Sequence, residues 1–259
     1  ETLGAKQGEV LTNHLIKSGV NWNKAFHKKA VRVDVTENFT PIRLPGGMLL
    51  TILSPTQKEL SKLQPKWVRE ARNAGIDPEN RLEELDDLVT RPSGREALGS
   101  ALPDVDALAV EESTLDSSEA NGSSIAFIAE YEEKRALFSG DAHSTVILDV
   151  LNQYLPNGEQ LKIDAFKTPH HGSDANITAE LLTRLECTKY LVSTNGAYFK
   201  HPDKAAISRI IKYGGNQPQI FFNYLSKYND VWDKQALKDR YDYKVYYPND
   251  LDSGIVVEL

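Results

Sequence analysis

The sequence predicts an α/β fold, and three observations predict it. Hydrophobic residues make up 40% of the chain and charged residues 26%, which is typical of a globular protein with a sizeable core. From residue 121 onward, strand-like and helix-like patterns alternate along the chain. Polar residues follow directly after several of the apolar strands, as they do where loops gather at one edge of a sheet.

The opening third is less regular. Apolar residues at helical spacing predict a helix over residues 7–18, and a second apolar stripe predicts a helix over 58–75. Residues 31–35 alternate as a strand does. Residues 40–44 and 48–53 flank a Pro-Gly-Gly turn, so we expect these two strands to form a hairpin.

Between these patterns and the regular region lies a segment of different composition. Acidic and small residues dominate from Asp77 to about Ala120, with scattered prolines and glycines. A charged run of this kind usually forms a solvated surface, so we expect an exposed insertion with short helices. A lid or a partner-binding insertion is the alternative.

The regular region supplies most of the predicted sheet. Its predicted strands are 124–131, 135–139, 161–167, 190–194 and 219–223, followed by a final pair at 244–247 and 254–258. The predicted helices are 145–154, 178–185 and 202–213. We therefore expect a single domain spanning residues 1–259, interrupted by the acidic insertion at about 77–120.

Composition and charge limit the classes of function. The net charge of −7 disfavours nucleic acid as a partner, because nucleic-acid-binding proteins usually carry a basic surface. No apolar run approaches the length of a membrane span, and no signal-peptide pattern is visible. The single cysteine, Cys187, suits a reducing compartment, so we expect a cytoplasmic protein in which Cys187 is a small core residue. Since the chain opens on Glu1 and its only methionine is Met48, we also expect the gene product to begin upstream.

Three successive predicted strands end in residues that can bind a metal. Asp141 follows the first strand, the pair His170 and His171 follows the second, and His201 comes shortly after the third. Each has an ordinary structural interpretation, a turn for Gly-Asp and a helix start for His-Pro, but the clustering favours a shared site. Aspartate and histidine without cysteine suit a divalent ion such as zinc, manganese or iron.

Weaker candidates lie beside these residues. His143 is either a ligand or hydrogen-bonded neighbour of the site, or the cap of the helix that follows it. Asp174 and Asn176 either orient the histidine pair or cap the next helix. Tyr198 either stabilises charge on a substrate or packs in its loop. The remaining histidines, His14 and His27, lie in the irregular opening segment.

These segments resemble a known family of enzymes. The stretches NGSSIAFIAEYEEKRALFSGDAH, LKIDAFKTPHHGSDANIT and YLVSTNGAYFKHPD, in this order, are similar to the distal half of metallo-β-lactamase-fold hydrolases. The similar branch includes the hydrolase domain of DNA-uptake competence proteins, and LPGGMLLTILSPT resembles the segment that precedes this half. The resemblance covers residues 45–224 without the insertion.

The resemblance implies a four-layered αββα sandwich with one or two metal ions in a cleft. It implies that Asp141 binds metal, that His170, His171 and His201 are ligands or their neighbours, and that a metal-activated water attacks the substrate. Asp141, His170 and His171 would be the catalytic residues. A phosphodiester is the preferred substrate, with amides, lactones and other small molecules left open.

One departure from the family is large. The family's first ligand cluster, His-x-His-x-Asp-His, is absent from this sequence. We therefore expect a partial domain that lacks its first metal-ligand segment, is a fragment of a longer protein and is inactive as it stands. The competing hypothesis is a non-catalytic module that binds a protein partner through the acidic insertion and a tyrosine-rich tail, with a vestigial metal site.

Overall fold

The computed structural model describes residues 4–33, 39–76, 102–249 and 254–259. The chain divides into two compact units, which are described separately. The first comprises Glu1–Ala30 and Lys58–Ala101, and the second comprises Val31–Gln57 and Leu102–Leu259. The predicted metal-binding residues all belong to the second unit.

The first unit is built on two helices, α1 (Ala5–Lys17) and α2 (Gln57–Asn73), with the short helix η1 (Lys24–Phe26) between them in sequence. Both long helices were predicted, and both are confirmed to within about two residues. A small core of Ala5, Ala71 and Ile76 joins them, with Trp67 packed against it. The Trp67 indole donates a 2.7 Å hydrogen bond to the buried Glu9 carboxylate, so burial of the ring leaves no indole N–H unpaired.

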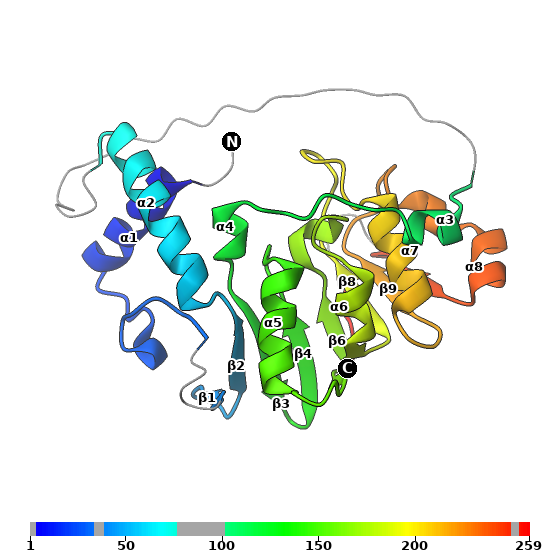
Figure 1. The fold of residues 1–259 in the computed structure, drawn as a ribbon, viewed down its shortest axis with the longest axis horizontal. Helices are drawn as coiled ribbons and strands as arrows, with labels where there is room; N and C mark the ends of the chain where they lie inside the picture. The colour runs from blue at the N-terminus through cyan, green and yellow to red at the C-terminus, as the bar shows by residue number, and fades with distance from the viewer. Residues whose placement is uncertain (1–3, 34–38, 77–101, 250–253) are drawn as a thin grey trace. The chain divides into compact units, whose positions relative to one another are not determined.

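The second unit is an α/β structure around a mixed sheet of eight strands in the order β1-β2-β3-β4-β6-β8-β9-β10 (Figure 1). Strands β1 to β4 pair with one another antiparallel. From β4 onward, through β6, β8, β9 and β10, neighbouring strands pair parallel. The strands are β1 (Ile42–Arg43), β2 (Leu49–Ser54), β3 (Ala126–Tyr131), β4 (Lys134–Phe138), β6 (Ala165–Lys167), β8 (Lys189–Val192), β9 (Gln219–Phe222) and β10 (Lys244–Tyr246). A separate parallel pair is formed by β5 (Leu161–Lys162) and β7 (Leu185–Glu186).

Helices connect the parallel strands and cover one face of the sheet. Figure 1 shows α5, α6 and α7 on the same side of the strands. The helices of this unit are α3 (Val105–Ala109), α4 (Glu119–Gly122), α5 (Ser144–Tyr154), α6 (Ala179–Thr183), α7 (Lys204–Tyr213) and α8 (Gln235–Tyr241), with short helices η2 (Pro169–Gly172) and η3 (Asp230–Asp233). Beneath the three helices lie fully buried side chains of the strands, among them Leu137, Phe166, Tyr190 and Ile220.

The second face of the sheet is apolar too, but it is less covered. The strand register places Ile52, Phe127, Ala129, Tyr131, Ala136, Phe138, Ala165, Leu191, Phe221 and Tyr246 on this face. The rings of Phe127 and Phe138 stack, yet Phe138 remains 37% exposed and Tyr131 45% exposed. In the described strands of this sheet, the charged residues that the register assigns to this face are Lys134, Lys167, Lys189 and Lys244. The second face thus combines exposed aromatic rings with lysines.

Most predicted elements of this unit are confirmed, including the hairpin of β1 and β2, but two strand predictions are wrong. Residues 161–167 do not form one strand, because the chain bends at Ile163–Asp164 and passes from the small sheet to the large one. Residues 254–258 form no strand, although the Lys189 ammonium of β8 donates to the carbonyl of Glu258. Of the predicted strand 31–35, residues 31–33 form no strand, and residues 34–35 lie outside the described residues.

A search of the described helices finds none with the length and apolar character that a membrane span requires.

Asp164, at the bend between β5 and β6, makes two contacts with β4 whose contribution to stability can be tested. The Asp164 carboxylate accepts a 2.8 Å hydrogen bond from the backbone N–H of Arg135 and lies 3.3 Å from the Lys134 ammonium, and these contacts hold its pKa below the ordinary value. We predict that Asp164→Ala lowers the free energy of unfolding by about 1 kcal/mol at pH 7, the usual net value of one hydrogen bond.

This cost depends on pH in a defined direction. Because the folded-state pKa of Asp164 is lowered, its stabilisation is present above about pH 4, the unfolded value, and is lost as the pH falls through the folded value. Urea unfolding of both proteins between pH 7 and pH 3.5 measures the difference, with the exposed Asp149→Ala on α5 as control. A cost that stays constant across this range would contradict the assignment.

Candidate functional site

The predicted site residues gather because their strands are parallel and adjacent. Strand β6 lies between β4 and β8, so the carboxyl ends of all three meet at one edge of the sheet. Asp141 follows β4, the histidine pair follows β6, and His201 follows β8 after a loop. A hydrogen bond from the Ser139 hydroxyl, which follows β4, to the Lys167 carbonyl of β6 links two of these strands at this edge.

The histidine pair sits in an unusual turn. His170 and His171 both adopt left-handed backbone conformations, with φ of 43° and 58°, and Gly172 follows with φ of 86°. Such conformations cost energy for residues with a side chain and persist only where the surroundings hold them. Here the N–H of His170 donates to the carbonyl of Gly140, and a Cβ atom at Gly172 would come within 2.8 Å of the Pro202 side chain. The turn sends the two rings in different directions.

His171 faces Asp141 at the exposed edge of the site. Its Nε2 atom lies 3.8 Å from the Oδ1 atom of Asp141, and the two side chains are 50% and 41% exposed. Its other nitrogen, Nδ1, lies 2.8 Å from the carbonyl oxygen of Ser193. Because a carbonyl can only accept, Nδ1 carries a hydrogen, and a neutral His171 then directs the Nε2 lone pair toward Asp141.

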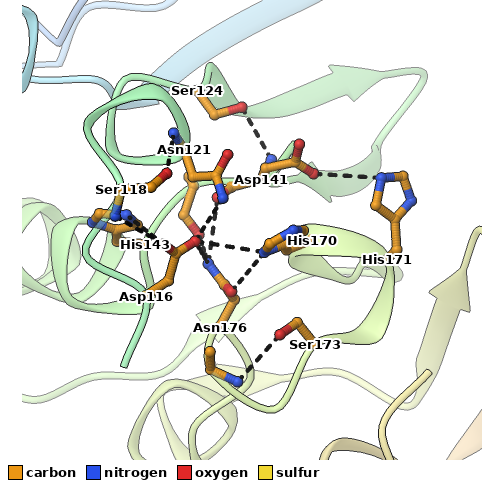
Figure 2. Close-up of polar contacts among 12 residues, drawn as sticks. Asp116, Ser118, Asn121, Ser124, Asp141, His143, His170, His171, Ser173 and Asn176 are labelled. Atoms are coloured by element: carbon orange, nitrogen blue, oxygen red, sulfur yellow. Dashed lines mark hydrogen bonds and ion pairs between the residues drawn. The ribbon is translucent and has the colours of Figure 1, made fainter. Parts of the chain in front are cut away.

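His170 turns away from Asp141 into a buried polar network (Figure 2). Its Nδ1 atom lies 3.0 Å from the Oδ1 atom of Asn176 and 3.5 Å from the carboxylate of Asp116. The amide group of Asn176 is oriented by its own donors, since its Nδ2 atom faces Asp116 and the carbonyls of Asp141 and Ala142. The oxygen of Asn176 therefore faces His170, and Nδ1 of His170 carries the hydrogen.

Asp116 is the centre of this network. One carboxylate oxygen accepts from the Ser118 N–H at 2.9 Å and lies 3.5 Å from Nε2 of His143, while the other accepts from the side chain of Asn121 at 2.7 Å. Burial alone would raise the pKa of Asp116, but the hydrogen bonds from Ser118, Asn121 and Asn176 outweigh burial, and its pKa lies below the ordinary value. Asp116 is therefore a carboxylate at neutral pH.

The structure decides between the alternatives for the neighbouring residues. His143 occupies the N-cap position of α5 but makes no capping bond, and its ring faces Asp116 instead. Asn176 orients His170, whereas the carboxylate of Asp174 accepts a hydrogen bond from the Ser113 hydroxyl of the neighbouring segment. The cap of α6 is Thr178.

His201 lies on the other side of His170, with their ring centroids 5.5 Å apart. Its Nδ1 atom is 3.2 Å from the carboxylate of Asp203, although the ring nitrogen is not aligned for a hydrogen bond. Burial would raise the pKa of Asp203, but His201 and the N–H of Asp174 lower it below the ordinary value. Phe199 stacks beside His201 and is largely exposed, as is Tyr198, so neither aromatic side chain of this loop is packed into the core.

Two further residues bear on the chemistry of the edge. Lys167 at the end of β6 is largely enclosed; burial lowers its pKa, while the charge of Asp141 opposes the shift. Its ammonium donates to the carbonyl of Thr168. Cys187 is buried as predicted, and burial raises the pKa of its thiol to about 12, which excludes a reactive thiolate at neutral pH.

The predicted metal ligands do not form one group. Among the residues that the structure describes, no set of three or more His, Cys, Asp or Glu side chains is placed to hold a metal ion. His171 and Asp141 face each other, His170 is directed to Asp116, and His201 to Asp203. Two of the four predicted ligands therefore face each other, and the other two lie beside them. His14 and His27 belong to the first unit.

Asp116 was missed by the sequence interpretation because it lies inside the predicted acidic insertion. Residues 77–101 of that insertion lie outside the described residues. Residues 102–120 contain the short helix α3 and the start of α4 and are mostly exposed, but a few of their side chains are directed inward. Val105 and Ala109 of α3 are buried, and α3 contacts α7. We call residues 110–118 the strap, because they run from α3 to α4 and carry Asp116 to the histidines. The only signal in the sequence is Asp116 followed by Ser118 and Asn121, a spacing that resembles any capping segment.

A buried arginine anchors the strap. Arg209 of α7 is 5% exposed and donates to the carbonyls of Asp174 and Ile177 and, on the strap, to the carbonyl of Glu111 and the hydroxyl of Ser113. Planar guanidinium groups suit such sets of acceptors because their donors have fixed directions. Arg209 thereby links the strap to the loop that carries Asn176.

We predict that Arg209→Met lowers the free energy of unfolding by about 3 kcal/mol, because it leaves buried acceptors without donors. Chemical denaturation of the two proteins measures the loss. Lys212→Met on the same helix is the matched control, since the ion pair of Lys212 with Asp106 is exposed to solvent and should contribute little to stability. Equal losses for the two variants would show that Arg209 does not anchor the strap.

Comparisons with models of protein families, with curated proteins and with solved structures found no match to this chain.

Proposed function

We propose that the protein is a metal-dependent hydrolase of the metallo-β-lactamase type, with Asp141 and His171 as two of the ligands of a divalent cation. The observation that carries this proposal is the orientation of His171. Its Nδ1–H is directed to the carbonyl of Ser193, so in the neutral ring the lone pair is on Nε2, which lies 3.8 Å from a carboxylate oxygen of Asp141. A backbone carbonyl behind a histidine ring is the usual partner of a histidine that binds a metal.

The distances and the chemistry of the two donors suit a cation between them. Zinc binds histidine nitrogen and carboxylate oxygen at about 2.0–2.2 Å, so two ligands of one ion lie within about 4 Å of each other. The separation of 3.8 Å between Nε2 and Oδ1 is within this range. Zinc suits this nitrogen and oxygen pair, as do manganese and iron. Two donors are half of a tetrahedral shell, so the proposal requires further ligands beyond this pair.

The remaining residues at the edge have roles that follow from their positions. A cation bound by Asp141 and His171 would lower the pKa of a water and polarise the electrophile. His170 and His201 lie beside the pair, with acceptors facing their Nδ1 atoms. The half-buried ammonium of Lys167, close enough to Asp141 to sense its charge, favours an anionic substrate such as a phosphodiester.

The second face of the sheet supports the finer fold assignment within this proposal. Soluble proteins seldom leave neighbouring aromatic side chains such as Phe127, Phe138 and Tyr131 partly exposed on a broad apolar face. In an αββα sandwich a second sheet would cover this face, and the absent His-x-His-x-Asp-His cluster would belong to that layer. The two missing parts of the family pattern, a covering layer and further ligands, would then have one source.

The same face also favours the alternative function, a non-catalytic module that binds a protein partner. Its charged strand residues are lysines in a chain with a net charge of −7, so a partner with an apolar centre and acidic rim would complement it. The two functions differ in their dependence on metal. A partner-binding module with a vestigial site does not require a cation at Asp141 and His171.

We predict that the protein, freed of metal and then titrated with Zn²⁺, binds zinc at a site that needs both donors. Asp141→Ala and His171→Ala should each lower the affinity at least about 10-fold, because each removes one of the two neighbouring ligands. Equilibrium dialysis with metal analysis measures the affinity. Asp149→Ala, on the exposed side of α5, and His14→Ala, on α1, are matched controls that should bind as the unaltered protein does.

Hydrolysis is tested with the same set of proteins and a chromogenic phosphodiester, in the presence of zinc or manganese. Release of product that depends on the metal, and is lost in Asp141→Ala, would support the enzyme. Zinc binding that is unchanged in both site variants would contradict the proposed ligands. The lack of any zinc binding by the unaltered protein would contradict the hydrolase and favour the partner-binding module.

A further inference from the structure

The structure assigns to Asp116 a role outside the strand-end motifs: we infer that it is a positioning residue, which sets the hydrogen of His170 on Nδ1 and so leaves Nε2 of that ring as the nitrogen with a free lone pair. This inference rests on the proposed function for its consequence, but not for its geometry. Asp116 comes from the strap, 54 residues before His170 in sequence, and its side chain is only 10% exposed.

Three hydrogen-bond donors surround the carboxylate of Asp116. Ser118 donates to one carboxylate oxygen, whereas Asn121 and Asn176 donate to the other. An amide in the same place would direct its NH₂ group at one of these donors, so only a carboxylate satisfies both sides. The environment therefore selects an ionised aspartate, in agreement with its lowered pKa.

The negative charge of Asp116 acts on two histidine rings. Asp116 lies between two imidazole rings, with one oxygen 3.5 Å from Nε2 of His143 and the other 3.5 Å from Nδ1 of His170. The oxygen of Asn176 reinforces the effect on His170 at 3.0 Å (Figure 2). Two acceptors at Nδ1, one of them charged, favour the tautomer with hydrogen on Nδ1 and a lone pair on Nε2.

The orientation of His170 also affects the two other histidines at this edge of the sheet. The His170 ring packs edge-on against the rings of His171 and His201, with centroid separations of 6.1 and 5.5 Å. The left-handed backbone at His170 and His171 leaves the pair few alternative arrangements. Because Asp116 and Asn176 hold the His170 ring at Nδ1, they also restrict the rings of His171 and His201 that pack against it.

The test reads the tautomer directly. In ¹⁵N-labelled protein without added metal, two-bond ¹H–¹⁵N correlation spectra distinguish a protonated from an unprotonated ring nitrogen, and His170→Gln assigns the signals. We expect Nδ1–H alone for His170 in the unaltered protein and a mixture of both tautomers in Asp116→Asn. Asn121→Ala, which removes one hydrogen bond from Asp116 but keeps the charge, should shift the mixture in the same direction and by less. Asp149→Asn is the control and should change nothing.

Zinc affinity is measured on the same proteins. We expect Asp116→Asn to weaken zinc binding about 10-fold or more, the usual effect of losing a group that orients the ligand shell. Unchanged His170 signals in folded Asp116→Asn would overturn the inference, even if zinc binds and substrate is hydrolysed. If Asp116→Asn does not fold, unchanged signals in Asn121→Ala would overturn it. A tautomer that shifts as expected in a protein that binds no zinc would support the role of Asp116 and reject the proposed hydrolase.

Discussion

The parallel register of β4, β6 and β8 is the constraint on which the rest of the site depends. Strands that run in the same direction deliver their following loops to the same edge, so residues 30 or 60 positions apart in sequence become neighbours. The loop after the middle strand then has little space, because the backbone of Gly140 binds it on one side and Pro202 packs on the other. The left-handed turn at the two histidines is a consequence of this confinement. It sends one imidazole outward to Asp141 and the other inward to Asp116.

The inward and outward histidines have similar chemistry in different surroundings. A neutral acceptor faces Nδ1 of each ring, a backbone carbonyl for His171 and a side-chain amide for His170. The second acceptor of His170 is a buried carboxylate, which makes its orientation the more strongly determined of the two. The outer histidine is suited to binding and the inner one to holding the arrangement in place.

The sequence predicted what depends on local pattern. The strands β3, β4, β8 and β9, the helices α5, α6 and α7, and the three strand ends that bear Asp141, the histidine pair and His201 follow from the pattern of apolar residues and from Gly and Pro at the turns. The sequence did not predict which histidine faces Asp141, because this depends on two positive φ angles. Nor did it predict Asp116, whose partners lie as much as 60 residues away and whose own segment reads as acidic surface. The split at Asp164 was missed for a similar reason, since a carboxylate bound to the neighbouring strand interrupts an otherwise continuous apolar run.

The anchoring of the strap by Arg209 has a consequence for how this protein tolerates change. Helix α3 contacts α7, and the guanidinium holds the chain at Glu111 and Ser113, so the position of Asp116 is determined after residue 102. A substitution in α3 or in the strap that keeps this attachment would therefore leave the carboxylate that serves the site in register during evolution.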